Sequence, residues 1–424
     1  MPVNHVLIGI SGGIAAYKVC EVVSSLAKWG IEVRVILSRS AAEFVTPLTF
    51  ATLSRQLAYT DADFWQPTNG RPLHIELAEW ADVFLLAPVT ANTLAKLAYG
   101  MADNLLTNTV LASSCPILFA PAMNTTMWLQ PTVQENWQKL LKDSRYAAIA
   151  PTDGILACDA VGTGRMAEPK IILEYIESFL FTHGKQDLKG KKILVNAGGT
   201  REFIDSVRFI GNPSTGKQGI AIAKAAIHRG ATVTLITTSN SPLPVGEVTP
   251  SVRVVSTSAE MHQAMIDEFP FADMTIAAAA IGDVRSKITS DYKLPKSELP
   301  LNLELEYIPD IVADLASRKR PDQILVGFAA QTGTDQEVLT AAKDKLIRKG
   351  LDAIAANAVN SSQTGFGTDT NQATLIHQNG NVLSTPLCSK LELAHRFLDF
   401  LIQAISVFIQ CNCVVGASRP QHNY

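Results

Sequence analysis

The sequence has few of the features that place a chain in a specialised class of protein. Its six cysteines are scattered, and their spacing fits neither a disulfide framework nor a zinc site. Neither sign of charge is in excess, because the formal net charge is only −3 over 424 residues. This balance gives no electrostatic reason to expect nucleic acid or an anionic membrane as a partner.

Signals for export or membrane insertion are also missing. The chain leads straight into a strand pattern at His5, with no apolar core of a signal or transit peptide before it. The most apolar stretch, residues 397–417, is interrupted by Asp399, Gln403, Gln410 and Asn412. A transmembrane span is therefore not predicted, and we expect a cytoplasmic protein that does not act on membranes.

What the sequence does contain is the pattern of an α/β protein. Apolar residues make up 47% of a chain whose mean hydropathy is +0.15, which is typical of globular proteins. Apolar strands alternate with helix patterns, so we predict two Rossmann-like domains, each a mainly parallel sheet flanked by helices. A polar, glycine-broken segment near residue 185 indicates the boundary. The predicted domains are residues 1–185 and 190–405, followed by a tail, residues 406–424, that we expect to be disordered.

The first half opens with one strand–helix–strand unit. Residues 5–10 and 31–37 favour buried strands, and residues 14–30 favour a helix between them. Parallel units of this kind place ligands at the carboxyl ends of their strands. The first turn, Gly-Ile-Ser-Gly-Gly at residues 9–13, departs from G-x-G-x-x-G, and no acidic residue ends the second strand. It therefore favours a single phosphate, as in FMN, over a dinucleotide; a plain turn is the alternative.

Two later segments of the first half end in similar loops. Residues 83–108 contain a strand, a Pro-Val-Thr-Ala-Asn turn and a helix start, which is typical helix-entry chemistry. Residues 116–124 repeat the plan and end in Pro-Ala-Met-Asn. We expect these small polar loops to lie on the same edge of one sheet.

The second half is organised around residues 196–219, between a short apolar strand and a helix pattern. This stretch contains Gly-Gly-Thr at residues 198–200 and Asn-Pro-Ser-Thr-Gly-Lys at residues 212–217, with Arg201 and Arg208 as further cations. A glycine-rich turn lets backbone N–H groups approach an anion, and the helix N-terminus adds partial positive charge. The stretch therefore favours a phosphate site, although an ordinary turn with solvated charges is the alternative. No Walker lysine motif is present, so a P-loop enzyme is not predicted.

Together these motifs resemble a known family, the bacterial bifunctional phosphopantothenoylcysteine decarboxylase/phosphopantothenate–cysteine ligases. The first half is similar to flavoprotein cysteine decarboxylases in its Gly-x-Ser-Gly-Gly turn, His-Ile-Glu-Leu-Ala at 74–78, Pro-Ala-Met-Asn at 121–124 and Ala-Cys-Asp-x-x-Gly-x-Gly-Arg-Met at 157–166. The second half is similar to the ligases in Gly-Gly-Thr-Arg-Glu at 198–202 and in the residues that follow, up to Lys217. The resemblance runs from residue 1 to about residue 400 in unbroken motif order.

For the first half, the resemblance implies an FMN-dependent decarboxylase in which the flavin oxidises the substrate thiol and so provides an electron sink. It implies that His74 is the base or proton carrier, that Asn124 holds the substrate carboxylate and that Cys158 donates a proton. Each has a structural alternative, because His74 or Asn124 could cap a helix and Cys158 could be inert. The residues implied around the flavin are Ser11, Gly12, Ser38, Thr90, Asn92 and Asn108.

For the second half, the resemblance implies a ligase that activates 4′-phosphopantothenate as an acyl-cytidylate with CTP, after which the cysteine amine attacks. It implies that Asn212 stabilises the acyl-nucleotide and that Lys293, on a flexible segment, closes over the triphosphate. Asp283 could instead cap a turn, and Lys293 could be a solvated charge. The implied nucleotide-binding residues are Ala277, Ala278, Ala279, Asp283, Lys293, Pro309, Asp310, Ile311, Val312, Phe328, Lys345 and Lys349. The sequence departs from the family pattern at Pro295, Gln331 and Ala358.

The cofactors and partners implied by the resemblance are FMN, Mg²⁺ for the triphosphate, and the substrates 4′-phosphopantothenate, cysteine and CTP. No metal ligands are predicted. It also implies a homo-oligomer, trimeric through the first half and dimeric through the second. Two rival hypotheses are a regulatory protein of the same fold that binds flavin or nucleotide without turnover, and an NAD(P)-dependent oxidoreductase. His74 and Cys158 are both present, which disfavours the first, and the missing G-x-G-x-x-G disfavours the second.

Overall fold

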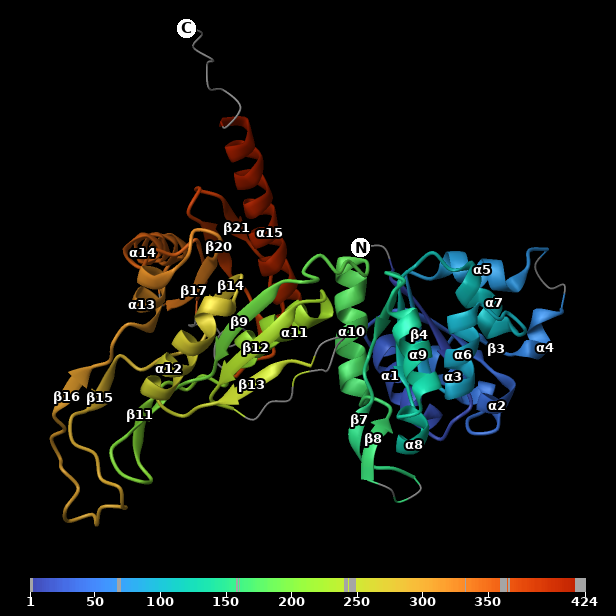
Figure 1. Ribbon diagram of the computed structural model, residues 1–424, viewed down its shortest axis with the longest axis horizontal. Helices are drawn as coiled ribbons and strands as arrows, with labels where there is room; N and C mark the ends of the chain where they lie inside the picture. The colour runs from blue at the N-terminus through green and yellow to red at the C-terminus, as the bar shows by residue number, and fades with distance from the viewer. Residues whose placement is uncertain are drawn as a thin grey trace, which may run out of the picture. The chain divides into compact units, whose positions relative to one another are not determined.

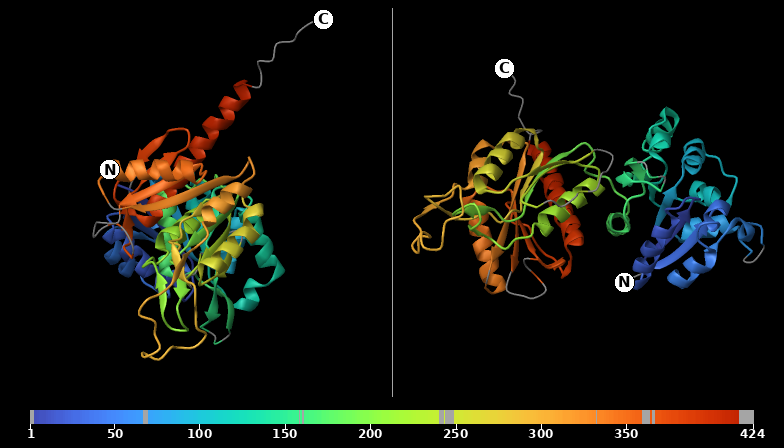
Figure 2. Two further views of the ribbon diagram at one scale, coloured as in Figure 1. Left: turned by 90° about the vertical axis from the view of Figure 1, so that its left-hand side faces the viewer. Right: turned by 90° about the horizontal axis from the view of Figure 1, so that it is seen from below.

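The structure is a computed structural model that describes residues 3–66, 70–157, 159, 161–239, 243, 249–331, 333–358, 364 and 367–415. Side chains are described within these ranges except at residues 331, 335 and 358 and after residue 403. The chain divides into two compact units (Figure 1): unit 1 is Met1–Asp187 with Pro244–Thr249, and unit 2 is Leu188–Leu243 with Pro250–Tyr424. In each unit a central sheet lies between two layers of helices (Figure 2).

Unit 1 is built on a six-stranded parallel sheet. Its central strands are buried on both sides, since they carry runs of branched aliphatic residues that suit a sheet covered by helices. In sheet order the strands are β3 (Ala58–Tyr59), β2 (Glu32–Leu37), β1 (His5–Ile10), β4 (Val83–Val89), β5 (Ile117–Pro121) and β6 (Tyr146–Ala148).

The helices of unit 1 cover both faces of this sheet. On one face lie α1 (Ala16–Lys28), α3 (Pro47–Ser54) and α10 (Pro169–Thr182). On the other lie α5 (Leu73–Trp80), α6 (Ala91–Tyr99), α7 (Leu105–Ala112) and α9 (Pro131–Leu140). Shorter elements complete the unit: α2 (Arg39–Ala42), α4 (Asp61–Phe64), α8 (Thr125–Trp128) and the antiparallel hairpin of β7 (Thr152–Ile155) and β8 (Val161–Arg165).

Unit 2 has an eight-stranded sheet that is parallel from β13 to β18 and ends in two antiparallel strands. In sheet order the strands are β13 (Ser251–Val254), β12 (Thr232–Thr237), β9 (Lys192–Ala197), β14 (Met274–Ala277), β17 (Ile324–Gln331), β18 (Ala353–Ala358), β20 (Thr374–His377) and β21 (Val382–Ser384).

Two helix layers and several small ribbons surround the sheet of unit 2. α11 (Lys217–His228) and α15 (Lys390–Val415) cover one face. α12 (Ser258–Glu268), α13 (Ile311–Arg318) and α14 (Asp335–Arg348) cover the other. The ribbons are β10 (Arg201–Phe203) with β11 (Phe209–Gly211), β15 (Val284–Ser286) with β16 (Leu305–Tyr307), and β19 (Thr370–Asn371) with β22 (Cys388–Ser389).

The predicted fold class is confirmed, because both units are mainly parallel α/β sheets flanked by helices. β14 begins at Met274, after a 3₁₀ turn at Phe269–Phe271 whose Phe269 carbonyl oxygen accepts a hydrogen bond from the Gln323 side chain. The antiparallel strands β20 and β21 were not expected. α15 continues past Ser406, where the predicted tail begins, and residues 416–424 lie outside the described residues. No helix among the described residues combines the length and apolarity needed to cross a membrane.

Candidate functional site

In unit 1, Ser11 joins the two loops that follow β1 and β4. Its side chain is buried, with 2% of the residue exposed. The hydroxyl donates to the Pro88 carbonyl oxygen at 2.7 Å and accepts from the Thr90 N–H at 2.9 Å. The Ser11 hydroxyl is thus engaged by backbone, so its contribution to a phosphate site is to hold two loops in place.

The turns after β1 and β2 also touch. A Cβ atom on Gly12 would lie 2.3 Å from Cβ of Ser40 and 2.8 Å from its carbonyl carbon, so no side chain fits there. Ser38 caps α2, and its hydroxyl accepts from the Ala41 N–H at 3.3 Å. The predicted flavin-site residues Gly12 and Ser38 are therefore part of one tight junction at the carboxyl edge of the sheet.

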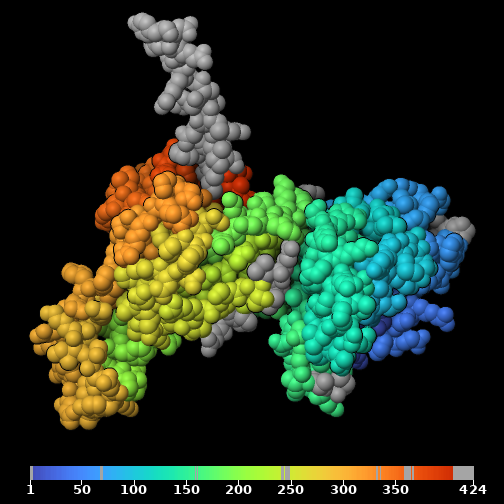
Figure 3. All heavy atoms as spheres, in the orientation of Figure 1, coloured from blue at the N-terminus to red at the C-terminus, as the bar shows by residue number. Residues whose placement is uncertain are grey.

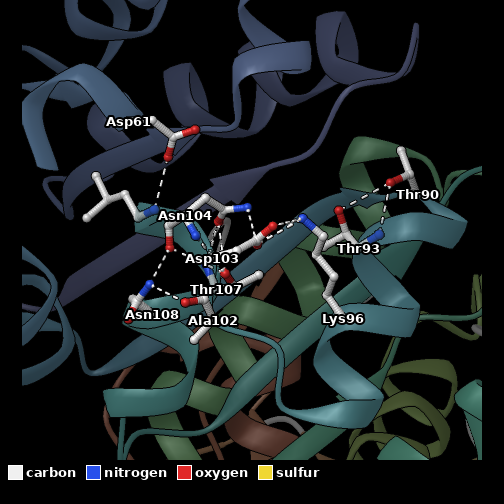
Figure 4. Close-up of polar contacts among 10 residues, drawn as sticks. Asp61, Thr90, Thr93, Lys96, Ala102, Asp103, Asn104, Thr107 and Asn108 are labelled. Carbon is white, nitrogen blue, oxygen red and sulfur yellow. Dashed lines mark hydrogen bonds and ion pairs between the residues drawn. The ribbon is translucent and has the colours of Figure 1, made fainter.

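The remaining predicted flavin-site residues lie at the starts of α6 and α7 (Figure 4). Thr90 caps α6 by accepting from the Thr93 N–H at 3.3 Å, and Asn92 is exposed in the first turn of the same helix. Asn108 uses its side-chain amide to donate to the carbonyl oxygens of Ala102 and Asn104, at 3.0 and 2.9 Å. These two bonds from Asn108 hold the loop between α6 and α7 in place.

Polar pairs brace this loop further. Lys96 on α6 forms an ion pair with Asp103 at 2.6 Å, and the hydrogen bond from Lys96 lowers the pKa of the Asp103 carboxyl. Asp61, from α4, accepts from the Leu105 N–H at 3.0 Å and so ties α4 to the first residue of α7. Asn104 and Thr107 form a capping box at the same helix start. This edge of unit 1 is a set of capped helix starts whose positions are mutually restrained.

The predicted catalytic residues of unit 1 come from different parts of the sheet edge. His74 lies in the first turn of α5, after β3; its ring packs edge-on against Phe64 at 5.4 Å, and its Nδ1 is buried without a hydrogen-bond partner among the described residues. Asn124 follows β5 and caps α8 by accepting from the Thr126 N–H at 2.8 Å. Because β3 is the first strand of the sheet and β5 the fifth, the two come from separate ends of the edge, as α5 and α8 do in Figure 1. Cys158 lies outside the described residues.

In unit 2, the glycine-rich stretch lets the start of α11 approach the end of β9. The N-cap residue Gly216 has φ of +75°, and a Cβ atom there would lie 2.9 Å from the Gly198 nitrogen. A Cβ atom on Gly219 would lie 2.7 Å from Cβ of Ala197. Only glycine permits this approach, which directs the N-terminus of α11 at the carboxyl edge of the sheet.

A cavity of about 680 Å³ opens at that edge. It is lined by the end of β14 and the residues that follow it, the start of α11, the segment before α13, part of β17 and one side of α14. All of the predicted nucleotide-site residues line this cavity except Lys293. The predicted residues that do are Asn212, Ala277, Ala278, Ala279, Asp283, Pro309, Asp310, Ile311, Val312, Phe328, Lys345 and Lys349.

Lysines of α14 provide one cationic side of this cavity. Lys345 donates to the Phe328 carbonyl oxygen at 2.8 Å, and burial lowers the pKa of its ammonium group. Lys349 pairs with Asp310 at 2.8 Å. Burial alone would raise the pKa of Asp310, but the bond from Lys349 and the N–H groups at the start of α13 hold it below its usual value.

A second pair of lysines comes from the opposite helix layer. Lys217, which the sequence analysis named only as part of the motif, donates to Asp369 at 2.6 Å and to the Gly367 carbonyl oxygen at 2.8 Å. Lys390, at the start of α15, donates to the Thr368 carbonyl oxygen, and burial together with Lys217 lowers its pKa. Lys390 was not predicted to line the cavity. It is a single lysine at a helix start, and no sequence pattern connects it with the distant motif at residues 212–217.

Comparison with known proteins agrees with the division of the chain into two units. Residues 1–181 match the family described as Flavoprotein, and residues 188–405 match the DNA/pantothenate metabolism flavoprotein C-terminal domain. The Coenzyme A biosynthesis bifunctional protein CoaBC of Bacillus subtilis is 41% identical over 399 residues, covering 93% of this chain and 96% of the relative. The chain belongs to the family of coenzyme A biosynthesis bifunctional proteins. The relative of the same name in Vibrio cholerae is 42% identical, covering 94% of this chain and 98% of its own.

Membership of this family identifies the chain as a bifunctional enzyme, with a flavoprotein decarboxylase domain followed by a ligase domain. The rival hypothesis of a non-catalytic regulatory protein is not supported. A further relative, a cysteine/cysteine sulfinic acid decarboxylase from an unknown prokaryotic organism, is 40% identical and covers 82% of this chain and 96% of its own.

The three departures from the family pattern lie at the margins of the described site. Pro295 is exposed in the segment between β15 and β16, two residues after Lys293. Gln331 ends β17 and Ala358 ends β18, and the side chains of both lie outside the described residues. Pro295 does not line the cavity of unit 2.

Proposed function

We propose that unit 2 joins cysteine to 4′-phosphopantothenate with CTP, and that unit 1 decarboxylates the resulting 4′-phosphopantothenoylcysteine with FMN. The observation that carries the proposal is the cavity of unit 2, which gathers lysines from both helix layers at the N-terminus of α11. Such a cavity suits a ligand with several phosphate groups.

For the ligase step, each part of the cavity suits one part of the reactants. A carboxylate is a poor electrophile at neutral pH, so it must first be activated by a nucleotide. Lys345 and Lys349 are placed to bind phosphate oxygens, and Phe328, which packs on Phe397 with ring centroids 5.4 Å apart, is placed to stack on a base. Asn212 lines the same cavity and is proposed to stabilise the acyl-nucleotide.

Mg²⁺ is proposed to enter with the triphosphate. Among the described residues, no group of three or more His, Cys, Asp or Glu side chains could hold a metal ion. Magnesium typically takes one or two carboxylates and completes its shell with phosphate oxygens and water. The cavity offers single carboxylates, such as Asp283, and so fits a cation carried in by the nucleotide.

The edge of unit 1 fits FMN on two observations. The Gly12 junction leaves no room for a side chain, and α1 and α6, whose N-termini carry partial positive charge, both begin at this edge. His74 also carries a buried ring nitrogen without a partner. Bound FMN would supply the oxidation that makes loss of carbon dioxide possible. The residues proposed to hold it are Ser11, Gly12, Ser38, Thr90, Asn92 and Asn108.

The protein's own groups would bind the substrate and handle protons. We assign His74 as the base or proton carrier, Asn124 as the group that binds the substrate carboxylate, and Cys158 as the proton donor. A carboxamide binds a carboxylate without neutralising it fully, which keeps the carboxylate ready to leave.

An obligate homo-oligomer is part of the proposal, trimeric through unit 1 and dimeric through unit 2. His74 and Asn124 come from separate ends of one sheet edge, so a second copy could bring the missing partner to each. Large apolar side chains are exposed on both units: Leu48 and Trp65 on unit 1 are 74% and 82% exposed, and Leu301 and Tyr307 on unit 2 are 96% and 88% exposed. Exposed apolar groups of this size favour protein–protein contact.

The domain limits and location remain part of the same proposal. We propose a decarboxylase domain at residues 1–185, a ligase domain at 190–405 and a separate tail at 406–424, in a cytoplasmic enzyme that acts on small molecules. The two family matches and the two compact units support this division.

The test is to incubate the purified chain with 4′-phosphopantothenate, cysteine, Mg²⁺ and either CTP or ATP, and to follow products by mass. Formation of 4′-phosphopantetheine with CTP is expected. Phosphopantothenoylcysteine alone would contradict the assignment of unit 1, and absence of any product would contradict the assignment of unit 2, after which supplied 4′-phosphopantothenoylcysteine tests unit 1. A parallel reaction with free cysteine as the only substrate tests the activity named for the cysteine/cysteine sulfinic acid decarboxylase relative, and no carbon dioxide release is expected.

A further inference from the structure

Asp205 is a buried carboxylate that has no part in the cavity of unit 2. It lies in the turn between β10 and β11, and its side chain is fully inaccessible to solvent. Its Oδ1 accepts from the N–H groups of Val207 at 2.9 Å and Arg208 at 2.7 Å. These bonds fix the turn and lower the pKa of the Asp205 carboxyl.

The second oxygen of Asp205 reaches out of the turn. Its Oδ2 pairs with Nη1 of Arg208 at 3.1 Å and accepts from the backbone N–H of Leu294 at 3.3 Å. Nη2 of Arg208 in turn donates to the Leu294 carbonyl oxygen at 3.3 Å. One ion pair therefore holds both backbone polar groups of Leu294, and Leu294 follows Lys293.

The contact joins two segments that are far apart in the chain. Leu294 belongs to the long connection from β15 to β16, which is drawn in orange in Figure 3 and lies beside the green atoms of the β10–β11 ribbon. A backbone hydrogen bond from Ser290 to the Ile204 carbonyl oxygen, at 3.0 Å, adds a second attachment. The connection is thus anchored on both sides of Lys293 by the same turn.

The β10–β11 ribbon also carries Asn212. The ribbon pairs Phe203 with Phe209 next to the Asp205 turn and Arg201 with Gly211 at its other end. Asn212 follows Gly211 directly, lines the cavity and donates to the Ile281 carbonyl oxygen at 3.1 Å. One short ribbon therefore connects Asn212 at one end with the anchor of Lys293 at the other.

Lys293 itself is exposed and does not line the cavity. A lysine on a long connection loses much conformational entropy when it engages a ligand, and the loss is smaller when its neighbour is already fixed. An anchor at Leu294 limits the positions from which the Lys293 side chain can reach phosphate.

We propose that Asp205 and Arg208 are positioning residues of the ligase, which clamp Leu294 and thereby set the reach of Lys293 relative to Asn212. This rests on the proposed ligase function and on the assignment of Lys293. The clamp is a charge-assisted contact between the buried Asp205 carboxylate and the Arg208 side chain, which is 32% exposed, so loss of the Arg208 charge leaves a buried carboxylate without its ion-pair partner.

The first test is Asp205→Asn in the full chain. The asparagine keeps an oxygen for the turn but presents an N–H donor to Leu294 and Arg208, so it breaks the clamp selectively. Pyrophosphate release from CTP and 4′-phosphopantothenate without cysteine isolates the activation step. We expect kcat to fall by about 10- to 100-fold and KM for both substrates to change by less than about threefold.

Glu202→Gln is the matched control. Glu202 is also buried, three residues away in the same ribbon, and accepts from the Ser258 N–H at 3.0 Å, but it does not contact Leu294. Its substitution should change kcat by less than about twofold. Unit 1 gives an internal check, because decarboxylation of supplied 4′-phosphopantothenoylcysteine should be the same in all variants.

A double-mutant cycle separates positioning from general damage. If Asp205 acts through Lys293, Asp205→Asn should reduce kcat far less in a Lys293→Ala background than in the natural chain. The proposal would be overturned if the fold reduction of kcat in the double variant equalled the product of the reductions in the two single variants.

Hydrogen exchange gives a readout that does not depend on activity. Amides at residues 290–296 should exchange at least about tenfold faster in Asp205→Asn than in the natural chain or in Glu202→Gln. Unchanged exchange would overturn the clamp even if the enzyme works as proposed. Faster exchange in Asp205→Asn, together with a natural chain that releases no pyrophosphate, would uphold the clamp and reject the proposed ligase function.

Discussion

The two units place their predicted site residues in different ways. In unit 2, side chains from both helix layers and from several strand ends line one cavity within a single chain. In unit 1, Ser11, Ser38, Thr90 and Asn124 are used as caps and ties along the sheet edge, and His74 and Asn124 come from separate ends of it. The cavity of unit 2 is lined within one chain, whereas completion of the unit 1 site by a second copy stays a proposal.

The strongest test of this difference is complementation between variants. We expect His74→Asn or Asn124→Asp to lower decarboxylation by about 100-fold or more, since each removes a group proposed to touch the substrate. Mixed oligomers of the two variants, formed by dissociation and reassembly, should regain a substantial fraction of the activity if each site takes His74 and Asn124 from different copies. Carbon dioxide release is the measurement.

The matched experiment in unit 2 uses Asn212→Asp and Lys345→Ala. Both side chains line the same cavity of one chain, so mixed oligomers should show no recovery of ligation. The proposed difference between the units would be contradicted if mixed oligomers regained ligation, or if they regained no decarboxylation.

A smaller effect is expected from Ser11→Ala. The change removes the hydroxyl that links the loops after β1 and β4, so the Thr90 N–H loses its acceptor, while the Pro88 carbonyl oxygen keeps only the Ser11 N–H, at 3.2 Å. We expect about 1–3 kcal/mol of destabilisation of unit 1, and a weaker affinity for FMN that flavin fluorescence can follow. Ser38→Ala, which removes only a cap on the short helix α2, should cost about 1 kcal/mol or less.

Much of the fold and of the unit 2 cavity could be predicted from sequence because the signals are local. Apolar runs of strand length and glycine-rich turns mark where β1, β9 and their helices begin. The segment 309–312, which was named from the family resemblance, lines the cavity, and its nucleotide-binding role stays a prediction. Lys390 and the contact of Asp205 with Leu294 could not be predicted, since each depends on segments that meet only after folding.

For the predicted flavin-site residues of unit 1, the local sequence does not decide the role of the side chain. A serine, threonine or asparagine at a strand end can bind a phosphate or cap a helix, and its local sequence is the same in both cases. The structure gives Ser11, Ser38 and Thr90 backbone partners within the protein. Their contact with a ligand therefore stays a prediction that their backbone partners do not test.

The smallest predicted effect concerns the response of unit 2 to acid. Burial, with His395 and Lys224 nearby, holds the pKa of His228 well below 6.5 in the folded chain, whereas the unfolded chain takes up a proton near that value. The unfolded state thus binds more protons below pH 6.5, and stability falls as pH falls. Between pH 7.5 and 5.5 we expect a loss of about 1 kcal/mol in unit 2.

Urea unfolding, followed by amide exchange in each unit, is the measurement for this prediction. His228→Asn should reduce the difference between pH 7.5 and 5.5 in unit 2, and unit 1 serves as the control. An equal loss at pH 5.5 with and without His228 would contradict the assignment.

The lysines on both sides of the unit 2 cavity have a consequence for inhibitor chemistry. A compound that fills the space between Lys217 and Lys390 on one layer and Lys345 and Lys349 on the other removes water from four ammonium groups. Lys217 and Lys349 keep their carboxylate partners Asp369 and Asp310, but a neutral scaffold does not replace the hydrogen bonds of the displaced water, so tight inhibitors of this cavity should carry acidic groups at both ends. Such dianions diffuse poorly through lipid, and a masked, ester-type precursor would be needed for them to act inside a cell.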